Sequence, residues 1–298
     1  MTTASASSNV SATPAEIGSR HWRVPYLLLL PGALWLLLFF FLPLIQLVIT
    51  SLQEGSLERG YDLAWAWDNY AALFTTYRAH ILRSLLFAGI ATLLALLIGY
   101  PLAYAIAFRS GRFKSLFLVL LLMPFLVPFL LRTLAWRIIL ADEGLVVQTL
   151  QTIGLLPTNG RILATPVAVV AGLTYNLMPF MVLPIYVALE KMDKALLEAS
   201  ADLYGGPLVS FWKVTWPLSL PGVISGTLLT FIPAAGDYVE VELLGNPQSA
   251  MVGNVIESKF LNVIDYPSAA AISVALMAVV VFLVVFYVRR VGTEELVT

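Results

Sequence analysis

The chain has 298 residues, of which 59% are hydrophobic and 12% are charged, with a net charge of −1 and a mean hydropathy of +0.87. Soluble domains carry about 25% charged residues, so this composition excludes an ordinary soluble protein and predicts an all-α membrane protein. The absence of cysteine excludes disulfide bonds and Cys-ligated metal sites. Two histidines, His21 and His80, are too few and too far apart in the sequence to predict a metal site.

Six apolar runs predict six transmembrane helices within a single membrane domain at residues 20–290. A Ser-, Thr- and Ala-rich stretch at residues 1–19 predicts a disordered tail before this domain, and residues 291–298 are expected to form a second tail. No cleavage site follows the first apolar run, so we expect this run to be retained, with kinks at Pro31 and Pro43. The runs occupy residues 24–50, 84–108, 115–131, 162–189, 219–235 and 269–288.

The fourth and fifth runs contain features that predict irregular helices. Pro179 and Pro184 interrupt the fourth run, and each proline removes a backbone hydrogen bond from a helix. The fifth run, at residues 219–235, is short for a hydrocarbon core of about 30 Å. Polar loops are expected between the runs, among them residues 141–161 and 236–268.

The distribution of charge predicts which side of the membrane each loop faces. With both termini inside, the inner segments hold ten basic and seven acidic residues, and the outer segments hold seven basic and eleven acidic residues. Lys and Arg favour cytoplasmic loops. The short loop RSGRFK, at residues 109–114, is basic and contains no acid. We therefore expect both termini to be cytoplasmic, together with the loop between the fourth and fifth runs.

That loop is a polar insert, and its pattern predicts two short helices joined by a tight turn. Asp193 is a good N-cap for the first helix because its carboxylate can accept free backbone N–H groups. Gly205 and Gly206 would end this helix, since glycine adopts a left-handed turn without a Cβ clash. Pro207 suits the first position of the second helix, and Pro217 is expected to end it.

One face of the first short helix is charged. Lys194, Glu198 and Asp202 are spaced four residues apart and therefore lie on the same side of the helix. The two acids could dock on a basic partner surface. The spacing alone equally fits a solvated cytoplasmic loop with ordinary helix charges.

The sequences EASADLYGGP and VTWPLSLPG, at residues 198–207 and 214–222, resemble the EAA motif in permease subunits of ATP-binding-cassette importers. The glycine of that motif falls at Tyr204 here, and two glycines follow it. The resemblance implies a coupling helix, within a loop at residues 190–218, that inserts into a cleft on a cytoplasmic ATPase. The residues that it assigns to ATPase coupling are Glu198, Ala199, Ser200, Asp202, Tyr204, Gly205, Gly206 and Pro207.

Acidic residues follow the fifth run in the sequence FIPAAGDYVEVELLGNP, at residues 231–247. Proline and glycine at the end of a short span predict an interrupted helix, which is tolerated at membrane depth where it packs in protein or lines water. Asp237, Glu240 and Glu242 are close together in the sequence and could form a negative mouth that attracts cations. They could equally solvate an external loop.

Polar side chains also occur within other predicted spans. Asn176 lies deep in the fourth run, where it either bonds a neighbouring helix or lines the path. Arg132 and Arg137 are expected to snorkel outward or to pair with acids of the outer loops, with a solute role as the alternative. The candidate residues for a translocation path or outer vestibule are Asp237, Tyr238, Glu240, Glu242, Tyr175 and Asn176.

Further stretches resemble the permeases of polyamine (spermidine and putrescine) importers. These are IGYPLAYAIA at residues 98–107, LLRTLAW at 130–136, MPFMVLPIYVALEKMD at 178–193, FIPAAGDYVEVELLGNP at 231–247 and MVGNVI at 251–256. The resemblance implies the type I ABC importer permease fold in the bacterial inner membrane and a small cationic solute. It also implies a second, different permease subunit, a cytoplasmic ATPase dimer and a periplasmic substrate-binding protein as partners. Relatives for opines, aminophosphonates or amino-acid-like solutes share much of the pattern, so the solute stays open.

No catalytic motif is evident, because the sequence has no Walker A pattern, no GxSxG and no His pair at ligand spacing. We expect a non-catalytic subunit without a cofactor or metal of its own, with ATP and Mg bound by the partner ATPase, and no nucleic-acid partner. A stand-alone channel or an ion-coupled carrier is the alternative function. It would need ionisable residues inside the spans, which are nearly absent, and a membrane enzyme would need a nucleophile and a base.

Overall fold

The computed structural model describes residues 23–202 and 206–291, which are mostly helical. The chain divides into two units, residues 1–47 and 48–298, which are described separately. Five of the described helices are long and apolar enough to cross a membrane, and a bent pair of helices brings the number to six if the pair is one span. The prediction of a helical membrane protein is therefore confirmed, with five or six candidate spans.

Helix α1 (Arg23–Leu36), a π-helical turn (Leu37–Phe41) and α2 (Leu42–Ser51) form the first apolar segment. The first N–H of α2 bonds to the carbonyl five residues back, at the start of the π turn. Pro43 has no N–H to give to the carbonyl four residues back, which favours a local widening of the helix at this point. The irregularity expected near Pro43 is thus present, whereas Pro31 lies inside α1.

The second unit contains the remaining elements. Its long helices are α4 (Arg78–Tyr104), α8 (Pro166–Glu190), α11 (Trp216–Gly236) and α14 (Tyr266–Val291). Its shorter α-helices are α3 (Asp68–Ala72), α5 (Lys114–Leu122), α6 (Phe129–Ile139), α7 (Leu145–Thr152), α9 (Lys194–Asp202), α10 (Pro207–Ser210), α12 (Val239–Leu244) and α13 (Val252–Glu257). Single π-helical turns lie at Leu73–Tyr77, Ala105–Arg109, Phe211–Thr215 and Ser258–Asn262, and 3-10 turns lie at Gly111–Phe113, Met123–Leu126 and Pro247–Ser249. An antiparallel hairpin joins β1 (Gln53–Ser56) to β2 (Gly60–Leu63).

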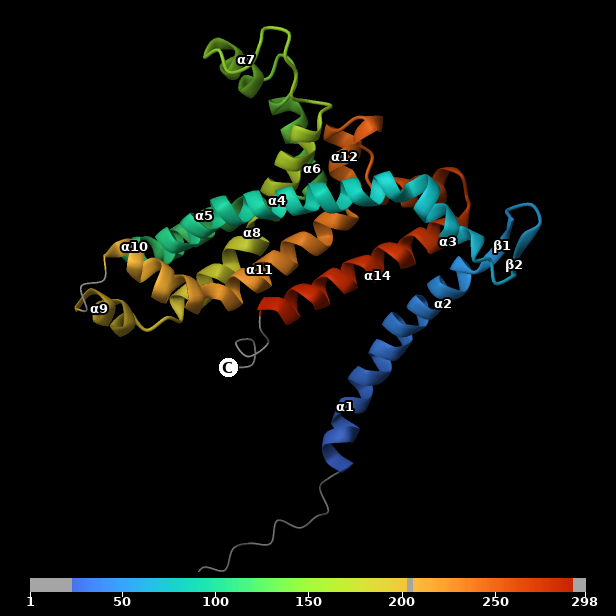
Figure 1. Ribbon diagram of the computed structural model, residues 1–298, viewed down its shortest axis with the longest axis horizontal. Coiled ribbons are helices and arrows are strands. Elements are labelled where there is room, and N and C mark those ends of the chain that lie inside the picture. The colour runs from blue at the N-terminus through green and yellow to red at the C-terminus, as the bar shows by residue number, and fades with distance from the viewer. Residues whose placement is uncertain (1–22, 203–205, 292–298) are drawn as a thin grey trace, which may run out of the picture. The chain divides into compact units, whose positions relative to one another are not determined.

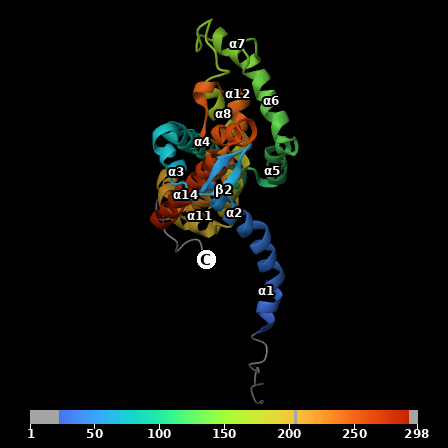
Figure 2. The ribbon, with the colours of Figure 1, turned by 90° about the vertical axis from the view of Figure 1, so that its right-hand side faces the viewer.

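Helices α4, α8 and α11 pack against one another and form the core of this unit, with α14 against α11 (Figure 1, Figure 2). Buried apolar side chains, among them Leu173 and Met181, fill the space between these helices. Glycine permits the closest approach, because a Cβ on Gly222 of α11 would lie 2.6 Å from the carbonyl oxygen of Pro184 on α8. Small residues of this kind let helix backbones approach closely in a membrane.

A buried hydrogen bond joins α4 to α11, since the hydroxyls of Tyr100 and Ser219 lie 2.8 Å apart. We expect Tyr100→Phe to lower the free energy of unfolding by about 1 kcal/mol, because it removes this bond and keeps the shape of the ring. Thermal unfolding of the protein in detergent measures the change, with Tyr104→Phe on the same helix as the control. If Tyr100→Phe were as stable as the wild type, this bond would not contribute to the α4–α11 contact.

The third span is bent by 91° where the 3-10 turn after α5 meets α6. Val127 and Pro128 have extended ψ angles of 135° and 140° between the two helices. Proline disfavours the helical conformation in the residue before it, so the chain changes direction at Val127. The predicted uninterrupted span at residues 115–131 is therefore wrong, and α6 continues the span in a new direction.

The prolines of the fourth and fifth spans do not end their helices. Helix α8 continues through Pro179 and Pro184 as one helix. The fifth span has 30 residues, Pro207–Gly236, because a π-helical turn joins α10 to α11. The expectations of a short fifth span and of a helix ending at Pro217 are therefore wrong. Packing against neighbouring helices supports proline within such helices.

The second span is also longer than expected, and runs for 42 residues from Asp68 to Arg109. The segment before it, expected to be a polar loop, folds into the β-hairpin. The side-chain amide of Asn69 donates to the carbonyls of Ser51 and Gln53, both at 3.1 Å, and holds the hairpin against α3. The hydroxyl of Tyr61 donates to the carbonyl of Ile264 at 2.5 Å and links the hairpin to the segment before α14.

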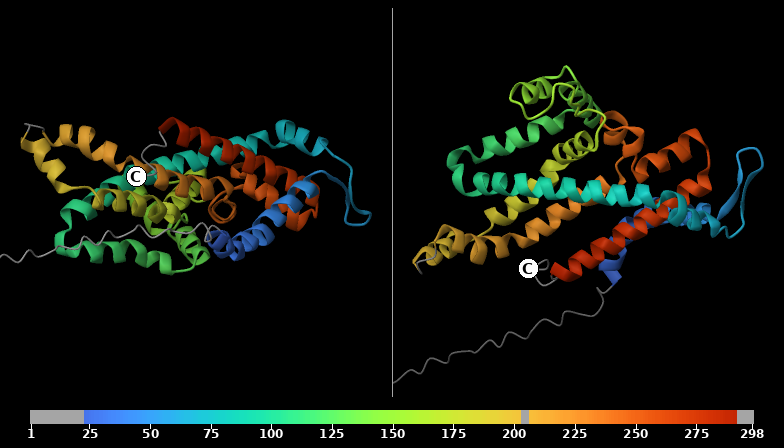
Figure 3. Two further views of the ribbon diagram at one scale, coloured as in Figure 1. Left: turned by 90° about the horizontal axis from the view of Figure 1, so that it is seen from below. Right: turned by 45° about the horizontal axis from the view of Figure 1, so that its top comes forward.

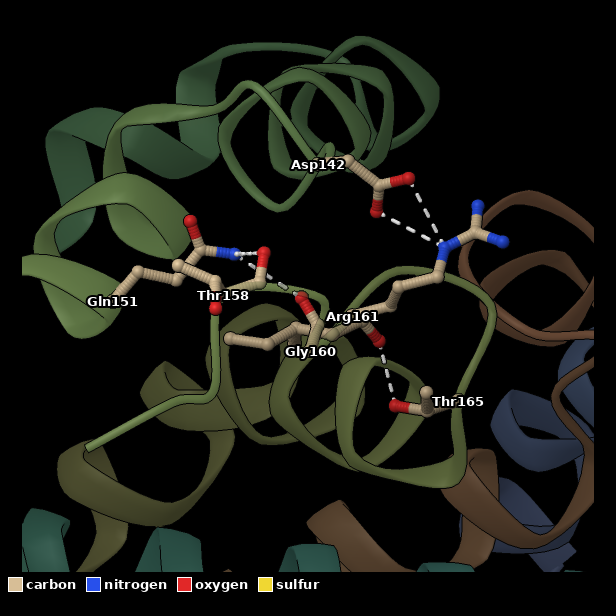
Figure 4. Close-up of polar contacts among 7 residues, drawn as sticks. Asp142, Gln151, Thr158, Gly160, Arg161 and Thr165 are labelled. Atoms are coloured by element: carbon tan, nitrogen blue, oxygen red, sulfur yellow. Dashed lines mark hydrogen bonds and ion pairs between the residues drawn. The ribbon is translucent and has the colours of Figure 1, made fainter. Parts of the chain in front are cut away.

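Residues 141–165, between α6 and α8, include α7 and are held together by local polar contacts (Figure 4). Nε of Arg161 donates to Oδ1 of Asp142 at 3.1 Å. The side-chain amide of Gln151 donates to the carbonyl of Thr158 at 3.2 Å. The predicted loop at residues 141–161 therefore contains a helix and forms an ordered extension at one end of α8.

Candidate functional site

Helix α12, in the segment expected to be a polar loop, packs against α6 and α8 and buries a carboxylate. Glu240 is 0% exposed, and its neighbours Asn176 on α8 and Thr133 on α6 are 3% and 0% exposed. The side-chain amide of Asn176 donates to Oε1 of Glu240 at 2.5 Å and to Oγ1 of Thr133 at 3.2 Å. These three residues, from three helices, form one buried polar cluster, which we call the Glu240 cluster.

Local contacts explain why α12 lies against α8. The carboxylate of Asp237 accepts the backbone N–H of Glu240 at 2.9 Å and caps the first turn of α12. A Cβ on Gly172 of α8 would lie 2.6 Å from Leu244 and 3.2 Å from Glu240, so a side chain at this position would push α12 away. At the end of α12 the carbonyl of Leu244 accepts the N–H of Ala164 at 2.9 Å.

The Glu240 cluster has two hydrogen-bond acceptors without a partner in the described chain. Oε2 of Glu240 and Oδ1 of Asn176 are both buried and unpaired. Leaving such an atom unpaired costs about 1–3 kcal/mol, so both atoms would be stabilised by an additional donor. Among the described residues no group of three or more His, Cys, Asp and Glu side chains could hold a metal ion. The donor that fits two amide and carboxylate oxygens is an N–H or O–H group.

The environment of Glu240 favours its protonated form. Burial, and after it the negative charge of Asp237, raise the pKa of Glu240 to about 8. The hydrogen bond from Asn176 and the positive charge of Arg132 act in the opposite direction. A cation that binds at Glu240 favours its ionised form, so binding near neutral pH would release a proton.

Aromatic rings gather around Tyr175, which precedes Asn176 on α8. The ring of Tyr175, the residue before Asn176, has its centroid 6.0 Å from that of Phe125 and 5.3 Å from that of Trp136. Aromatic faces attract cations, with an interaction of about 0.5–2 kcal/mol. A buried carboxylate near aromatic rings has the chemistry needed to bind an organic ammonium ion.

The structure brings together part of the predicted path. Asp237 and Glu240 lie at the start of α12 and Asn176 is bonded to Glu240, whereas Tyr238 and Glu242 are exposed. The three carboxylates differ in burial, since Asp237 is half-buried, Glu240 is buried and Glu242 is exposed, and the negative mouth stays a prediction. The alternative of solvated carboxylates is wrong for Glu240, which is buried between α6 and α8.

The structure differs from the sequence-based predictions at two residues of this region. Thr133 was not predicted, although it follows directly after Arg132 in an otherwise apolar helix. Arg132 was expected to extend outward or to pair with an acid, but its Nε and Nη1 atoms are buried and have no hydrogen-bond partner within residues 23–202 and 206–291. Its guanidinium lies 4.3 Å from the centroid of the Phe125 ring, so a cation–π contact takes the place of an ion pair. Arg137, further along α6, is exposed as expected.

The residues of the EAA-like motif form a helical corner at the opposite end of α8 (Figure 3). Oδ1 of Asp193 accepts the backbone N–H of Ala195 at 2.9 Å, which confirms Asp193 as the cap of α9. The hydroxyls of Ser200 and Ser210 lie 2.7 Å apart and connect α9 to α10. The polar insert therefore consists of the two expected helices, although the second one continues into the fifth span.

The surface of this corner combines acidic and apolar side chains. Glu198 and Asp202 are exposed, together with Ala199 and Pro207. Trp212, in the π-helical turn after α10, is 60% exposed.

The turn between α9 and α10 is only partly described. Tyr204 and Gly205 lie outside the described residues. Gly206 is extended, with φ −62° and ψ 163°, so the expected left-handed turn is absent at this position. Pro207 takes the first position of α10, as predicted.

An ion pair joins the corner to the short basic loop between the second and third spans. Nζ of Lys114 lies 2.5 Å from a carboxylate oxygen of Glu190, the last residue of α8. Both side chains are partly exposed, so this pair contributes little to stability. It does bring the loop RSGRFK to the same end of the bundle as α9.

Residues 95–292 match the family described as binding-protein-dependent transport system inner membrane component. The chain is 39% identical over 256 residues to the spermidine/putrescine transport system permease protein PotB of Escherichia coli strain K12, which covers 86% of this chain and 93% of that protein. PotB of Haemophilus influenzae is 36% identical over 256 residues, with coverages of 86% and 90%. The inner membrane ABC transporter permease protein YdcU of Escherichia coli is 32% identical over 178 residues, with coverages of 55% and 56%.

Solved structures share the fold of this chain. A bacterial ABC transporter involved in the import of the acidic polysaccharide alginate matches with a TM-score of 0.70 at 19% identity, over 91% of this chain and 96% of that chain. The MetNI methionine ABC transporter, in an inward-facing conformation, matches with a TM-score of 0.54 at 18% identity, over 72% and 95%. These likenesses confirm the predicted type I importer permease fold and do not bear on the solute. The chain belongs to the family of binding-protein-dependent transport system inner membrane components.

Proposed function

We propose that this chain is one permease subunit of an ATP-driven importer for polyamines such as spermidine and putrescine. The observation that supports this most is the 36–39% identity to PotB proteins along 86% of the chain. A second, independent support is the Glu240 cluster, since polyamines are flexible chains of ammonium groups that need carboxylates and aromatic faces. A polyanion such as alginate would be repelled by the same carboxylate.

In this proposal the Glu240 cluster is a point on the solute path. One ammonium group of the solute would donate to Oε2 of Glu240 and Oδ1 of Asn176, the two acceptors without a protein partner. Asp237 would add a second negative charge, and the ring of Tyr175 would provide an aromatic face. The exposed Tyr238 and Glu242 would belong to the vestibule that the solute crosses before it reaches the cluster.

We further propose that α9 is the coupling helix. Glu198, Ala199 and Asp202 would dock on a cytoplasmic ATPase dimer, which binds ATP and Mg. Because an even number of spans puts both termini on the side of α9, the termini would be cytoplasmic too. The partners would include a second permease subunit and a periplasmic substrate-binding protein, which delivers the solute to the opposite end of the bundle. Closure of the ATPase dimer would move the coupling helices together and rock the two permeases between inward- and outward-open states.

Uptake by the reconstituted complex tests the proposed solute. The importer, with its partner permease and ATPase, is placed in proteoliposomes and supplied with its binding protein and ATP. We expect ATP-dependent uptake of radiolabelled spermidine or putrescine that an excess of unlabelled polyamine inhibits. Uptake of an opine or an aminophosphonate without any polyamine uptake would contradict the proposal, and uptake without the ATPase would favour a channel or carrier.

The substitution Glu198→Lys tests the coupling role of α9. We expect polyamine uptake to fall at least about tenfold, because a reversed charge in the docking surface opposes the contact with the ATPase. The matched control is Glu143→Lys, which reverses the charge of an exposed acid in the segment before α8, away from α9. Both variants should insert into the membrane at wild-type levels, since both residues are exposed. Wild-type uptake by Glu198→Lys would rule out a docking role for this residue.

A further inference from the structure

Arg132 holds a positive charge beside the Glu240 cluster and forms no ion pair with an acid of the described residues. Its Nε and Nη1 atoms are buried and find no hydrogen-bond partner in that part of the chain. The guanidinium lies 4.3 Å from the ring centroid of Phe125 and 5.9 Å from that of Phe129. The two aromatic faces attract the charge, but they do not satisfy the N–H groups, which only donate hydrogen bonds.

The acid within electrostatic reach of Arg132 is Glu240. The positive charge of Arg132 favours the ionised form of Glu240 and acts across the contact between α6 and α12. Oε2 of Glu240 is itself buried and unpaired. The unpaired N–H groups of Arg132 and the unpaired Oε2 atom of Glu240 thus lie on two helices that are in contact, α6 and α12. They form no hydrogen bond with each other. Asp237, which accepts the backbone N–H of Glu240 at the start of α12, adds a second negative charge next to Glu240.

We propose that Arg132 is an internal competitor of the solute for Glu240, a role that rests on the proposed function. Arg132 alternates between the ring of Phe125, where the structure places it, and the carboxylate of Glu240. A cationic solute occupies Glu240 while Arg132 stays on Phe125, and Arg132 takes over the carboxylate as the solute leaves. The exchange gives the carboxylate a charged partner after the solute leaves, and the competing guanidinium weakens solute binding enough for release.

The geometry favours a guanidinium in this role. A guanidinium binds a carboxylate through two parallel N–H groups and also stacks on an aromatic ring, so it is suited to both positions. Phe125 precedes Arg132 on the same bent span, and Glu240 lies on α12, which is in contact with α6, so both partners of the exchange belong to neighbouring segments. Specificity for multiply charged solutes follows, since a solute must outcompete the positive charge of Arg132 for Glu240.

The kinetics of Arg132→Gln test the proposal in the reconstituted importer. We expect KM for spermidine to fall about tenfold, since the competing charge is absent, and the maximal rate to fall as release becomes slower. The matched control is Arg137→Gln, which removes an exposed charge from the same helix and should leave KM unchanged. Arg132→Lys keeps the charge and should restore KM toward the wild-type value.

Chemical rescue separates competition from a structural role. In Arg132→Ala, added guanidinium chloride should raise KM for spermidine, because the free ion replaces the lost side chain at Glu240. The same addition should leave KM of Arg137→Ala unchanged. An unchanged KM in Arg132→Gln, or no effect of guanidinium on Arg132→Ala, would overturn the competitor role. Absence of polyamine uptake by the wild-type importer would instead overturn the proposed function.

Discussion

Glu240→Gln is expected to lower polyamine uptake by at least about tenfold, the largest effect that we predict for a single side chain of the path. The substitution keeps the size of the side chain and removes its negative charge. A solute ammonium group would then lose its charged partner in a buried site, where such pairs are strong. Uptake of radiolabelled spermidine in proteoliposomes measures the effect, at equal amounts of assembled complex.

Glu242→Gln is the matched control for this prediction. Glu242 lies two residues further on α12 and is exposed in the vestibule, where solvent screens its charge, so the same neutralisation at this position should lower uptake less than Glu240→Gln does. Equal losses in both variants would point to the net charge of the segment rather than to the buried site. Wild-type uptake by Glu240→Gln would remove Glu240 from the path.

The pKa of Glu240 adds a pH dependence to the same site. Because burial and Asp237 raise the pKa of Glu240 to about 8, the carboxyl is mostly protonated at pH 7 and mostly ionised at pH 9. A solute cation that binds the carboxylate should therefore displace a proton at pH 7. Spermidine added to the unbuffered complex in detergent should release protons that a pH indicator detects. Proton release should be absent in Glu240→Gln, and equal release from both proteins would contradict the assignment.

Gly222→Val is expected to prevent correct packing of α8 against α11. A Cβ at position 222 would lie 2.6 Å from Cβ of Ala188 and 2.6 Å from the carbonyl oxygen of Pro184. Neither contact can be relieved by a rotamer change, so the two helices must separate. Overpacking of this kind costs about 1–3 kcal/mol, and we expect a lower thermal unfolding temperature and a lower yield of monodisperse protein. Fluorescence-detected size exclusion in detergent measures both.

The control for this substitution is Gly89→Val on α4. A Cβ at position 89 would have no neighbouring atom within 4 Å, so the same change of residue occurs there in open space. Gly89→Val should therefore unfold at about the wild-type temperature. Wild-type stability of Gly222→Val would mean that the α8–α11 contact does not depend on the close approach at this glycine.

Much of the fold was accessible from the sequence because hydrophobicity alone determines which segments enter a membrane. The six apolar runs correspond to the spans, and Asp193 caps α9 as its carboxylate predicts. The bend of the third span was also encoded, since Pro128 follows Val127 in a position that excludes a continuous helix. The length of the fifth span was not predictable, because a π-helical turn at residues 211–215 joins two helices that the prolines seemed to separate.

The interior of the candidate site required the structure. Asp237, Glu240 and Glu242 have similar neighbours in the sequence. The sequence therefore does not show that Glu240 is buried while Glu242 is exposed. Burial of Glu240 depends on Gly172, which is 68 positions away and admits α12 against α8. The partners of Glu240 likewise come from two other helices. The sequence therefore located the segment, while long-range packing determined which carboxylate is buried.

The central claim of this account is that α8 connects a solute site in its N-terminal half, at Asn176, to a cytoplasmic coupling surface at its C-terminal end. Its 25 residues span about 37 Å, enough to cross the hydrocarbon core. The chain has no cysteine, so single substitutions can report the side of each end. Glu143→Cys places an exposed thiol in the segment before α8, and Glu198→Cys places one on α9, just after α8.

Labelling of right-side-out membrane vesicles with a membrane-impermeant maleimide tests this claim most directly. We predict that Glu143→Cys is labelled in sealed vesicles and that Glu198→Cys is labelled only after the vesicles are permeabilised. Labelling of Glu198→Cys in sealed vesicles, with protection of Glu143→Cys, would contradict the account, because α9 would then face away from any cytoplasmic ATPase.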